Sequence, residues 1–213
     1  MGYLNAQVHN TCLTFDKLPD GVPTTDLGGG VIRLDSGPNV GRLVRHNGEK
    51  FTEVVETTNP TTGLKEFVAP VIVSQRNGAA FERALIEAAN DITGNVSKNG
   101  EILTTTLPDE RVVRTIPDIF GVGGGLADAK NVISAAATKQ LRGQIMIADE
   151  RGAPFTLVIS PRTERVSGPL RELIDGLRID GKPSGTISVF DPATGSFTEA
   201  VFDSAGNVVR GAP

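Results

Sequence analysis

The pattern of hydrophobic and polar positions divides the chain into two parts. Residues 1–75 contain short alternating runs that are separated by turns, with no helical period. Two of these turns are strong hairpin signals. Asn47-Gly48 suits a type I′ turn, and Asn59-Pro60-Thr61-Thr62-Gly63 has proline and glycine where a bulged turn needs them. We therefore expect a β-hairpin-rich N-terminal region over residues 1–76.

From Asn77 onwards the period becomes helical. Apolar residues recur at i, i+3, i+4 and i+7, namely at Phe81, Ala84, Leu85 and Ala88. This spacing predicts an amphipathic helix, and Asn77 has the side chain of an N-terminal cap. The change of period places a boundary near Ser74–Gly78 and predicts a second domain over residues 77–213.

The second domain is predicted to mix strands with helices. The pattern first gives a strand or hairpin around Lys98–Glu101 and a hairpin over residues 112–132. A helix from Ser134 to about Glu150, a buried strand at Pro154–Ser160 and a short helix between Ser167 and Gly176 follow. The last elements are strands at Thr186–Phe190 and Phe197–Phe202, on either side of a turn at Asp191–Gly195. This order favours an α/β fold with a mixed sheet flanked by helices.

The hairpin over residues 112–132 carries the candidate chemistry. Its first strand leads to Asp118, the glycine-rich segment 121–125 forms the turn, and the second strand contains Asp128 and Lys130. Paired strands lie about 5 Å apart, so the two carboxylates can meet across the ladder. Lys130 shares a face with Asp128 because side chains two apart project together. Such a group suits Mg²⁺ or Mn²⁺, which can polarise a phosphate.

These residues resemble the motif of a known family. Ile116-Pro117-Asp118 followed by Asp128-Ala129-Lys130-Asn131 resembles the PD-(D/E)xK motif of restriction-endonuclease-fold nucleases. The following segments, Thr138–Arg142 and Pro154–Pro161, resemble the endonuclease-fold domains of bacterial polymorphic toxins, which include contact-dependent inhibition and type VI secretion effectors. The resemblance covers roughly residues 77–192, and it implies a PD-(D/E)xK endonuclease-like sheet.

The resemblance also implies roles for individual residues. Asp118 and Asp128 would bind metal, together with the carbonyl of Ala129 and with Glu82 as a third carboxylate. Lys130 would orient water or stabilise charge. On the helix that follows, Gln140 would lie near the catalytic site, while Lys139 and Arg142 would bind phosphate. The alternative for each is an ordinary role on the surface, as a residue flanking a hairpin or on a polar helix face.

Charge and composition limit the possible functions. The net charge of −4 argues against a generic nucleic-acid binder, but residues 111–173 hold nine basic and six acidic residues. The single cysteine, Cys12, excludes an internal disulfide bond. No signal peptide or membrane-spanning apolar run is visible, so we expect export to depend on a larger parent protein or a secretion machine.

Together these observations predict a metal-dependent endonuclease toxin. It would cleave phosphodiester bonds in competing bacteria, acting in the cytoplasm of the target cell, with DNA as the favoured substrate and RNA left open. The resemblance implies a cognate immunity protein, and the basic site favours an acidic partner surface. The alternative function is a non-enzymatic binding or structural module of a delivery apparatus, which the acidic, hairpin-rich first third would suit.

Overall fold

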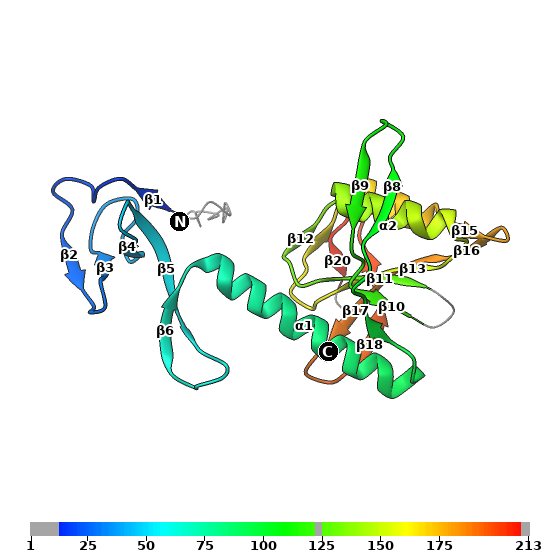
Figure 1. Cartoon of the computed structure of the whole chain (residues 1–213), viewed down its shortest axis with the longest axis horizontal. Helices are drawn as coiled ribbons and strands as arrows, with labels where there is room; N and C mark the ends of the chain where they lie inside the picture. Colours follow the sequence, from blue (N-terminus) through cyan, green and yellow to red (C-terminus); the bar gives the residue numbers. More distant parts are fainter. Residues whose placement is uncertain (1–12, 122–124, 210–213) are drawn as a thin grey trace. The chain divides into compact units, whose positions relative to one another are not determined.

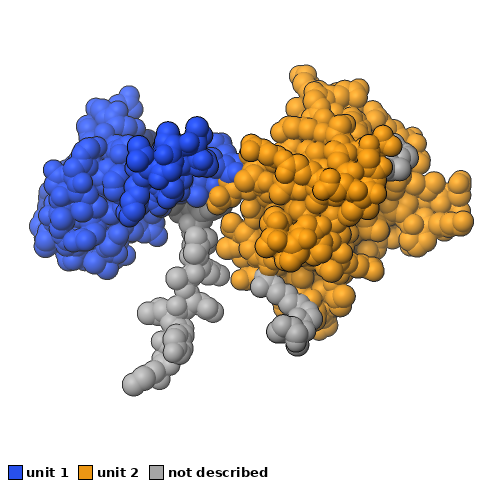
Figure 2. Space-filling view, turned by 90° about the horizontal axis from the view of Figure 1, so that it is seen from below, with its two compact units in different colours: residues 1–76 blue, residues 77–213 orange. Residues whose placement is uncertain are grey.

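The structure, a computed structural model, describes residues 13–121 and 125–209. Cys12 and the centre of the glycine-rich turn lie outside these ranges. The chain forms two compact units, residues 1–76 and 77–213 (Figure 2). That these units are domains with the two expected roles remains a proposal. Within the described ranges, no helix is long and apolar enough to cross a membrane.

The first unit is an antiparallel sheet made of hairpins. Its strands are β1 (Thr14–Phe15), β2 (Thr24–Asp26), β3 (Val31–Leu34), β4 (Leu43–His46), β5 (Phe51–Thr58) and β6 (Lys65–Val68). They lie in the order β1-β5-β4-β3-β2, and β6 pairs with β5. Both expected hairpin turns are confirmed, since Gly48 and Gly63 adopt φ angles of 104° and 71° in the connections on either side of β5.

Helix α1 (Pro70–Thr93) begins earlier than the sequence pattern indicates. Asn77 lies inside this helix, so the predicted cap at Asn77 is wrong. The run Val71-Ile72-Val73 is typical of a strand, but β propensity is easily overridden by context. Pro70 stands at the first helical position, where its fixed φ suits a helix and its missing N–H costs nothing.

A six-stranded mixed sheet forms the centre of the second unit. Its strands are β7 (Ser97–Lys98), β10 (Ile119–Phe120), β11 (Leu126–Lys130), β13 (Phe155–Ile159), β17 (Gly185–Asp191) and β18 (Ser196–Glu199), in the order β18-β17-β13-β11-β10-β7. The central strands β11, β13 and β17 are parallel, and the others pair antiparallel (Figure 1). The mixed α/β fold is therefore confirmed.

Shorter strands and two further helices complete this unit. They are β8 (Leu103–Thr106), β9 (Val112–Thr115), β12 (Ser134–Ala135), α2 (Lys139–Glu150), β14 (Arg165–Val166), α3 (Gly168–Asp175), β15 (Arg178–Ile179), β16 (Lys182–Pro183), β19 (Val201–Phe202) and β20 (Val208–Val209). The pairs β8–β9, β12–β14, β15–β16 and β19–β20 form two-stranded ribbons. The buried strand after residue 154, the helix before Gly176 and the turn at Asp191–Gly195 are as predicted.

Three further predictions differ from the structure. Among the described residues of the hairpin predicted over residues 112–132, only Ile119–Phe120 pairs with β11, while Val112–Thr115 pairs with β8. The helix expected from Ser134 begins at Lys139, because Thr138 caps it by accepting a hydrogen bond from the N–H of Leu141, while Ser134 and Ala135 pair with β14. The strand at Ser97–Lys98 is not part of a local hairpin. It pairs with β10, which comes later in the chain, so a local pattern could not reveal its partner.

The two faces of the sheet pack into separate hydrophobic cores. On one face, Leu126, Leu157 and Ile187 pack with residues of α2 and α3. On the other face, Ile119 and Val158 pack with Phe81 and Leu85 of α1. Figure 1 shows α1 and α2 on opposite sides of the sheet. The alternation along β11 therefore decides which helix layer each of its side chains meets.

Helix α3 and strand β17 approach closely at Gly185, which predicts a large effect of a single methyl group. A Cβ atom at Gly185 would lie 1.9 Å from the carbonyl oxygen of Ile174. Because backbone must move to relieve this overlap, we expect Gly185→Ala to lower the free energy of unfolding by roughly 3 kcal/mol or more. Chemical denaturation of the full chain measures the change.

Gly168 at the start of α3 provides the matched control. A Cβ atom there would have no neighbour within 4 Å, so Gly168→Ala should change stability by less than about 0.5 kcal/mol. Equal stability of the two variants would contradict the close approach of α3 and β17.

Candidate active site

The β10–β11 hairpin places Asp118 directly opposite Asp128. Ile119 pairs with Ala127 and Phe120 with Leu126, so the register continued by one residue aligns the two aspartates. Gly121 donates a hydrogen bond to Gly125, which makes the aligned aspartates a pair without mutual backbone hydrogen bonds. In such pairs the side chains are closest, and the alternation along β11 places Asp128 on the same face as Leu126, which packs with residues of α2.

Asp128 is completely buried and has few partners. Its Oδ2 forms an ion pair with the ammonium of Lys130, whose side chain remains 23% exposed. Among the described residues, neither carboxylate oxygen of Asp128 accepts a hydrogen bond. A buried carboxylate of this kind is costly unless further charge or hydrogen bonds compensate it. The single ion pair with Lys130 offsets only part of the cost of burying Asp128. It leaves lone pairs of the carboxylate oxygens without a hydrogen bond.

Asp118 is held by the neighbouring strand. Its Oδ2 accepts a hydrogen bond from the backbone N–H of Ala129 at 2.8 Å. Burial raises the pKa of Asp118 to about 6, and the nearby charge of Asp128 adds to the rise, while the bond from Ala129 and the charge of Lys130 oppose it. The two carboxylates therefore interact strongly, as their opposed positions in the ladder require.

Pro117 cannot donate a ladder hydrogen bond to the carbonyl of Ala129. The same register continued by two residues places Pro117 opposite Ala129, where an antiparallel ladder would exchange two hydrogen bonds. Proline has no N–H to donate to that carbonyl. The N–H of Ala129 turns instead to the Asp118 side chain.

Gln144 supports the segment before Asp118, a role that was not predicted from the sequence. This α2 residue is fully buried, and its Nε2 donates to the carbonyl of Ile116 at 3.3 Å. Its Oε1 has no hydrogen-bond partner in the described part of the chain. In the sequence, this role could have been recognised because Gln144 is a polar residue within the apolar helix face that contains Leu141, Ile145 and Ala148.

Glu82 is not drawn into one cluster with the two aspartates. It lies on α1, which covers the other face of the sheet, and its carboxylate pairs with Lys98 at 2.9 Å. Its charge still raises the pKa of Asp118, as the smallest of the contributing causes. No group of three or more His, Cys, Asp or Glu residues in the described ranges is arranged to hold a metal. Its role as third ligand stays a prediction.

The three polar residues predicted on α2 are all exposed. Gln140 lines a surface hollow with Ile116 and Arg114, so it lies beside the segment that leads to Asp118. Arg142 donates from Nε to the carbonyl of Ala137, which ties it to the loop before the helix. Lys139 projects into solvent at the first residue of α2. Their predicted roles remain untested.

The chemistry of the hairpin fits a hard divalent cation. Asp128 offers buried oxygens that lack hydrogen bonds, Asp118 has a second carboxylate that repels the first, and Ala129 adds a carbonyl. All three are oxygen donors of the type that Mg²⁺ and Mn²⁺ prefer. A cation here would relieve the repulsion that raises the pKa of Asp118.

The raised pKa of Asp118 predicts how stability depends on pH in the absence of metal. The carboxyl group of Asp118 has a pKa of about 6 in the folded protein, whereas its ordinary pKa is 3.8. Between these two pH values the folded state therefore binds more protons than the unfolded state does. Stability from this group should therefore fall by roughly 2 kcal/mol as the pH rises from 4 to 6.

Comparison with Asp118→Asn isolates this contribution. Other carboxyl groups with lowered pKa values, such as Asp35 and Asp203, change stability in the opposite direction in both proteins. Denaturation in EDTA at several pH values should show that the variant lacks the additional fall. If the wild-type chain and Asp118→Asn differed in stability by the same amount at every pH, the pKa of Asp118 would not be raised.

Comparison with known proteins gives one family. Residues 78–170, slightly less than half of the chain, match the family described as restriction endonuclease fold toxin 7. No curated protein matches the chain. A solved structure of SfsA from Pyrococcus furiosus in complex with Ca²⁺ is 10% identical and covers 93% of this chain and 91% of its own, with a TM-score of 0.33. The resemblance seen in the motifs is thus confirmed, because residues 78–170 match a family of toxins with the restriction endonuclease fold.

Proposed function

We propose that the second unit is a metal-dependent endonuclease that acts as a toxin in competing bacteria. The observation that carries this proposal is the pair of opposed carboxylates, Asp118 and Asp128, with Lys130 on the same face and the Ala129 carbonyl beside them. The match to a toxin family with an endonuclease fold supports the same reading. DNA is the favoured substrate, and RNA is the alternative that the same experiment tests.

Each residue of the group has a separate part in the proposed hydrolysis. Asp118, Asp128 and the carbonyl of Ala129 would hold Mg²⁺ or Mn²⁺, which would supply Lewis-acid chemistry at the phosphate and lower the pKa of a bound water. Lys130 has one partly exposed ammonium at the end of β11, where it orients the attacking water or stabilises developing negative charge. Gln144 positions the segment that carries Asp118.

Delivery and protection form the other half of the proposal. A toxin of this family would reach the cytoplasm of another cell through a larger parent protein or a secretion machine. The producing cell would need a cognate immunity protein. Residues 111–173 hold nine basic and six acidic residues, so an acidic partner surface would be attracted to this region.

Nucleic-acid cleavage provides the direct test. The purified chain should cut plasmid DNA with Mg²⁺ or Mn²⁺ and lose this activity in excess EDTA, with tRNA assayed in parallel. Asp128→Asn and Lys130→Ala should each lower the rate by at least about 100-fold, because each removes charge at the reacting phosphate. Gel analysis of cleavage over time measures both effects.

Two controls separate chemistry from folding. Lys182→Ala removes an exposed lysine on β16, far from β11 in the sheet pairing, and should cleave at the wild-type rate. Mg²⁺ should raise the melting temperature of the wild-type chain and have a smaller effect on Asp128→Asn. Undiminished cleavage in EDTA would refute the metal requirement. If neither DNA nor tRNA is cut, the binding-module alternative is favoured.

Expression in a bacterium tests the toxin role. The intact chain made in the cytoplasm should stop growth and degrade chromosomal DNA or tRNA, whereas the Lys130→Ala chain should be tolerated at the same level. Co-expression of the open reading frame next to the gene should restore growth if it encodes the immunity protein. Normal growth with intact nucleic acids, at good expression of the wild-type chain, would contradict the proposal.

A further inference from the structure

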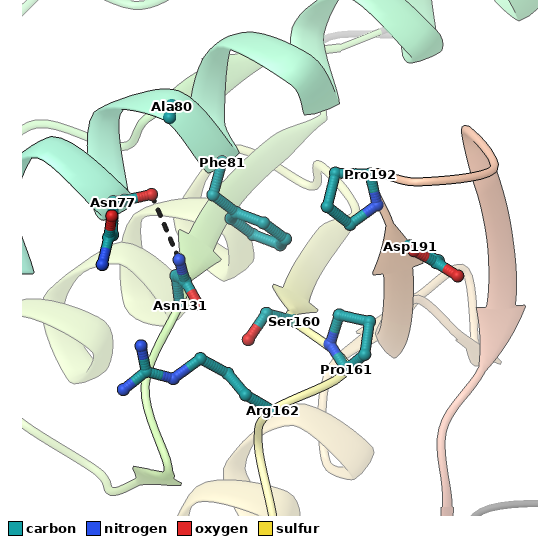
Figure 3. Close-up of a pocket in the computed structure, with 9 residues that line it drawn as sticks. All are labelled: Asn77, Ala80, Phe81, Asn131, Ser160, Pro161, Arg162, Asp191 and Pro192. Carbon is teal, nitrogen blue, oxygen red and sulfur yellow. Dashed lines mark hydrogen bonds between the residues drawn. The ribbon is translucent and has the colours of Figure 1, made fainter. Parts of the chain in front are cut away.

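A pocket lies at the carboxyl ends of the three parallel strands. Its cavity volume is about 440 Å³, and Figure 3 shows the residues that line it. The segments that follow β11, β13 and β17 contribute most of the lining, and α1 closes one side with Asn77, Ala80 and Phe81. Ligands of open α/β sheets commonly bind at this edge. The size suits a small ligand or one unit of a polymer.

The polar lining contains a hydroxyl group that lacks a partner. Ser160 is only 3% exposed, and its Oγ has no hydrogen bond to any described residue. Figure 3 shows this hydroxyl facing into the pocket. Asn131 lies beside it, with its side-chain amide donating to the carbonyl of Asn77 at 3.1 Å. That bond fixes the Asn131 side chain and leaves its carbonyl oxygen free to accept.

Arg162 supplies an available positive charge. It is exposed, and no hydrogen bond or ion pair of its side chain is found in the described parts of the chain. Its guanidinium lies on the side of Asn131 and Asn77 (Figure 3). Asp191 lies on the opposite side, where its Oδ1 accepts a hydrogen bond from the N–H of Ala193 at 2.9 Å. A guanidinium without a partner is well suited to bind a phosphate group.

The pocket adjoins the proposed catalytic lysine across the edge of the sheet. The N–H of Ser160 donates to the carbonyl of Lys130 at 3.1 Å, and Asn131 directly follows Lys130. Because neighbouring side chains on a strand point to opposite faces, Lys130 projects toward α2 and Asn131 toward α1. A polynucleotide crossing this edge would meet the catalytic group on one face and the pocket on the other.

We propose that this pocket binds a nucleotide of the substrate that flanks the scissile phosphate. Arg162 binds the phosphate of that nucleotide, Ser160 and Asn131 bind its polar groups, and Phe81, Pro161 and Pro192 provide an apolar surface for the sugar or base. The inference rests on the proposed nuclease function, since it names a second contact for the same substrate.

Arg162→Ala tests the proposal in two assays, with Arg165→Ala as the matched control. Arg165 is an exposed arginine on β14 that does not line the pocket. First, binding of a fluorescent oligonucleotide is measured in EDTA at several salt concentrations. Arg162→Ala should raise Kd about tenfold and reduce the slope of log Kd against log salt by about 0.7 to 0.9, because one phosphate contact is lost. Arg165→Ala should keep the wild-type values.

The second assay measures cleavage in Mg²⁺. Arg162→Ala should lower kcat/KM about tenfold while kcat stays within about threefold of wild type, because Arg162 does not touch the reacting atoms. Arg162→Lys should recover part of the loss. Wild-type binding and salt slope for Arg162→Ala would overturn the proposal and leave the nuclease function standing if cleavage persists. Failure of the wild-type chain to bind the oligonucleotide would also overturn it. Binding without cleavage would refute the nuclease function and, with it, the placement of the pocket beside a scissile phosphate.

Discussion

Electrostatic repulsion between two carboxylates in one strand ladder is the constraint on which this unit depends. Asp118 and Asp128 are aligned across the β10–β11 hairpin, and Asp128 has no exposed surface. Such a pair is unfavourable by itself, and the fold offsets it locally with the ammonium of Lys130 and the N–H of Ala129. The well-packed layers on both faces of the sheet supply the stability that permits this local cost. A divalent cation would convert the repulsion into binding energy.

The backbone contributes as much to this arrangement as the side chains do. Pro117 has no N–H to give to the ladder, and the N–H of Ala129 holds the side chain of Asp118. Gln144 of α2 then holds Ile116, the residue before Pro117, because its side-chain amide donates a hydrogen bond to the carbonyl of Ile116. The short segment at residues 116–118 is therefore held from two elements although it belongs to neither.

Local patterns predicted the parts of the structure that depend on neighbouring residues. The facing aspartates, the buried strand at Phe155–Ile159 and the helix ending at Gly176 follow from alternation, period and turn chemistry. Features set by distant contacts were missed or misplaced. Helix α1 begins in a run of β-branched residues, and Glu82 meets Lys98 of an edge strand. Gln144 rather than Gln140 is buried, a choice that depends on which face of α2 meets the sheet.

The positions of the two groups of residues have a consequence for how such a protein could diversify. The carboxylates, the lysine and the glutamine lie on a central strand, its hairpin partner and a buried helix face, where substitutions disturb packing. Asn131, Arg162 and Pro192 lie in connections after the strands, where exchanges disturb the packing less. If the second unit is the proposed nuclease, variation in these loops could alter which sequence or inhibitor it recognises while the reaction stays the same. One inherited scaffold could thus yield lineages that differ in target and immunity but share a single chemistry.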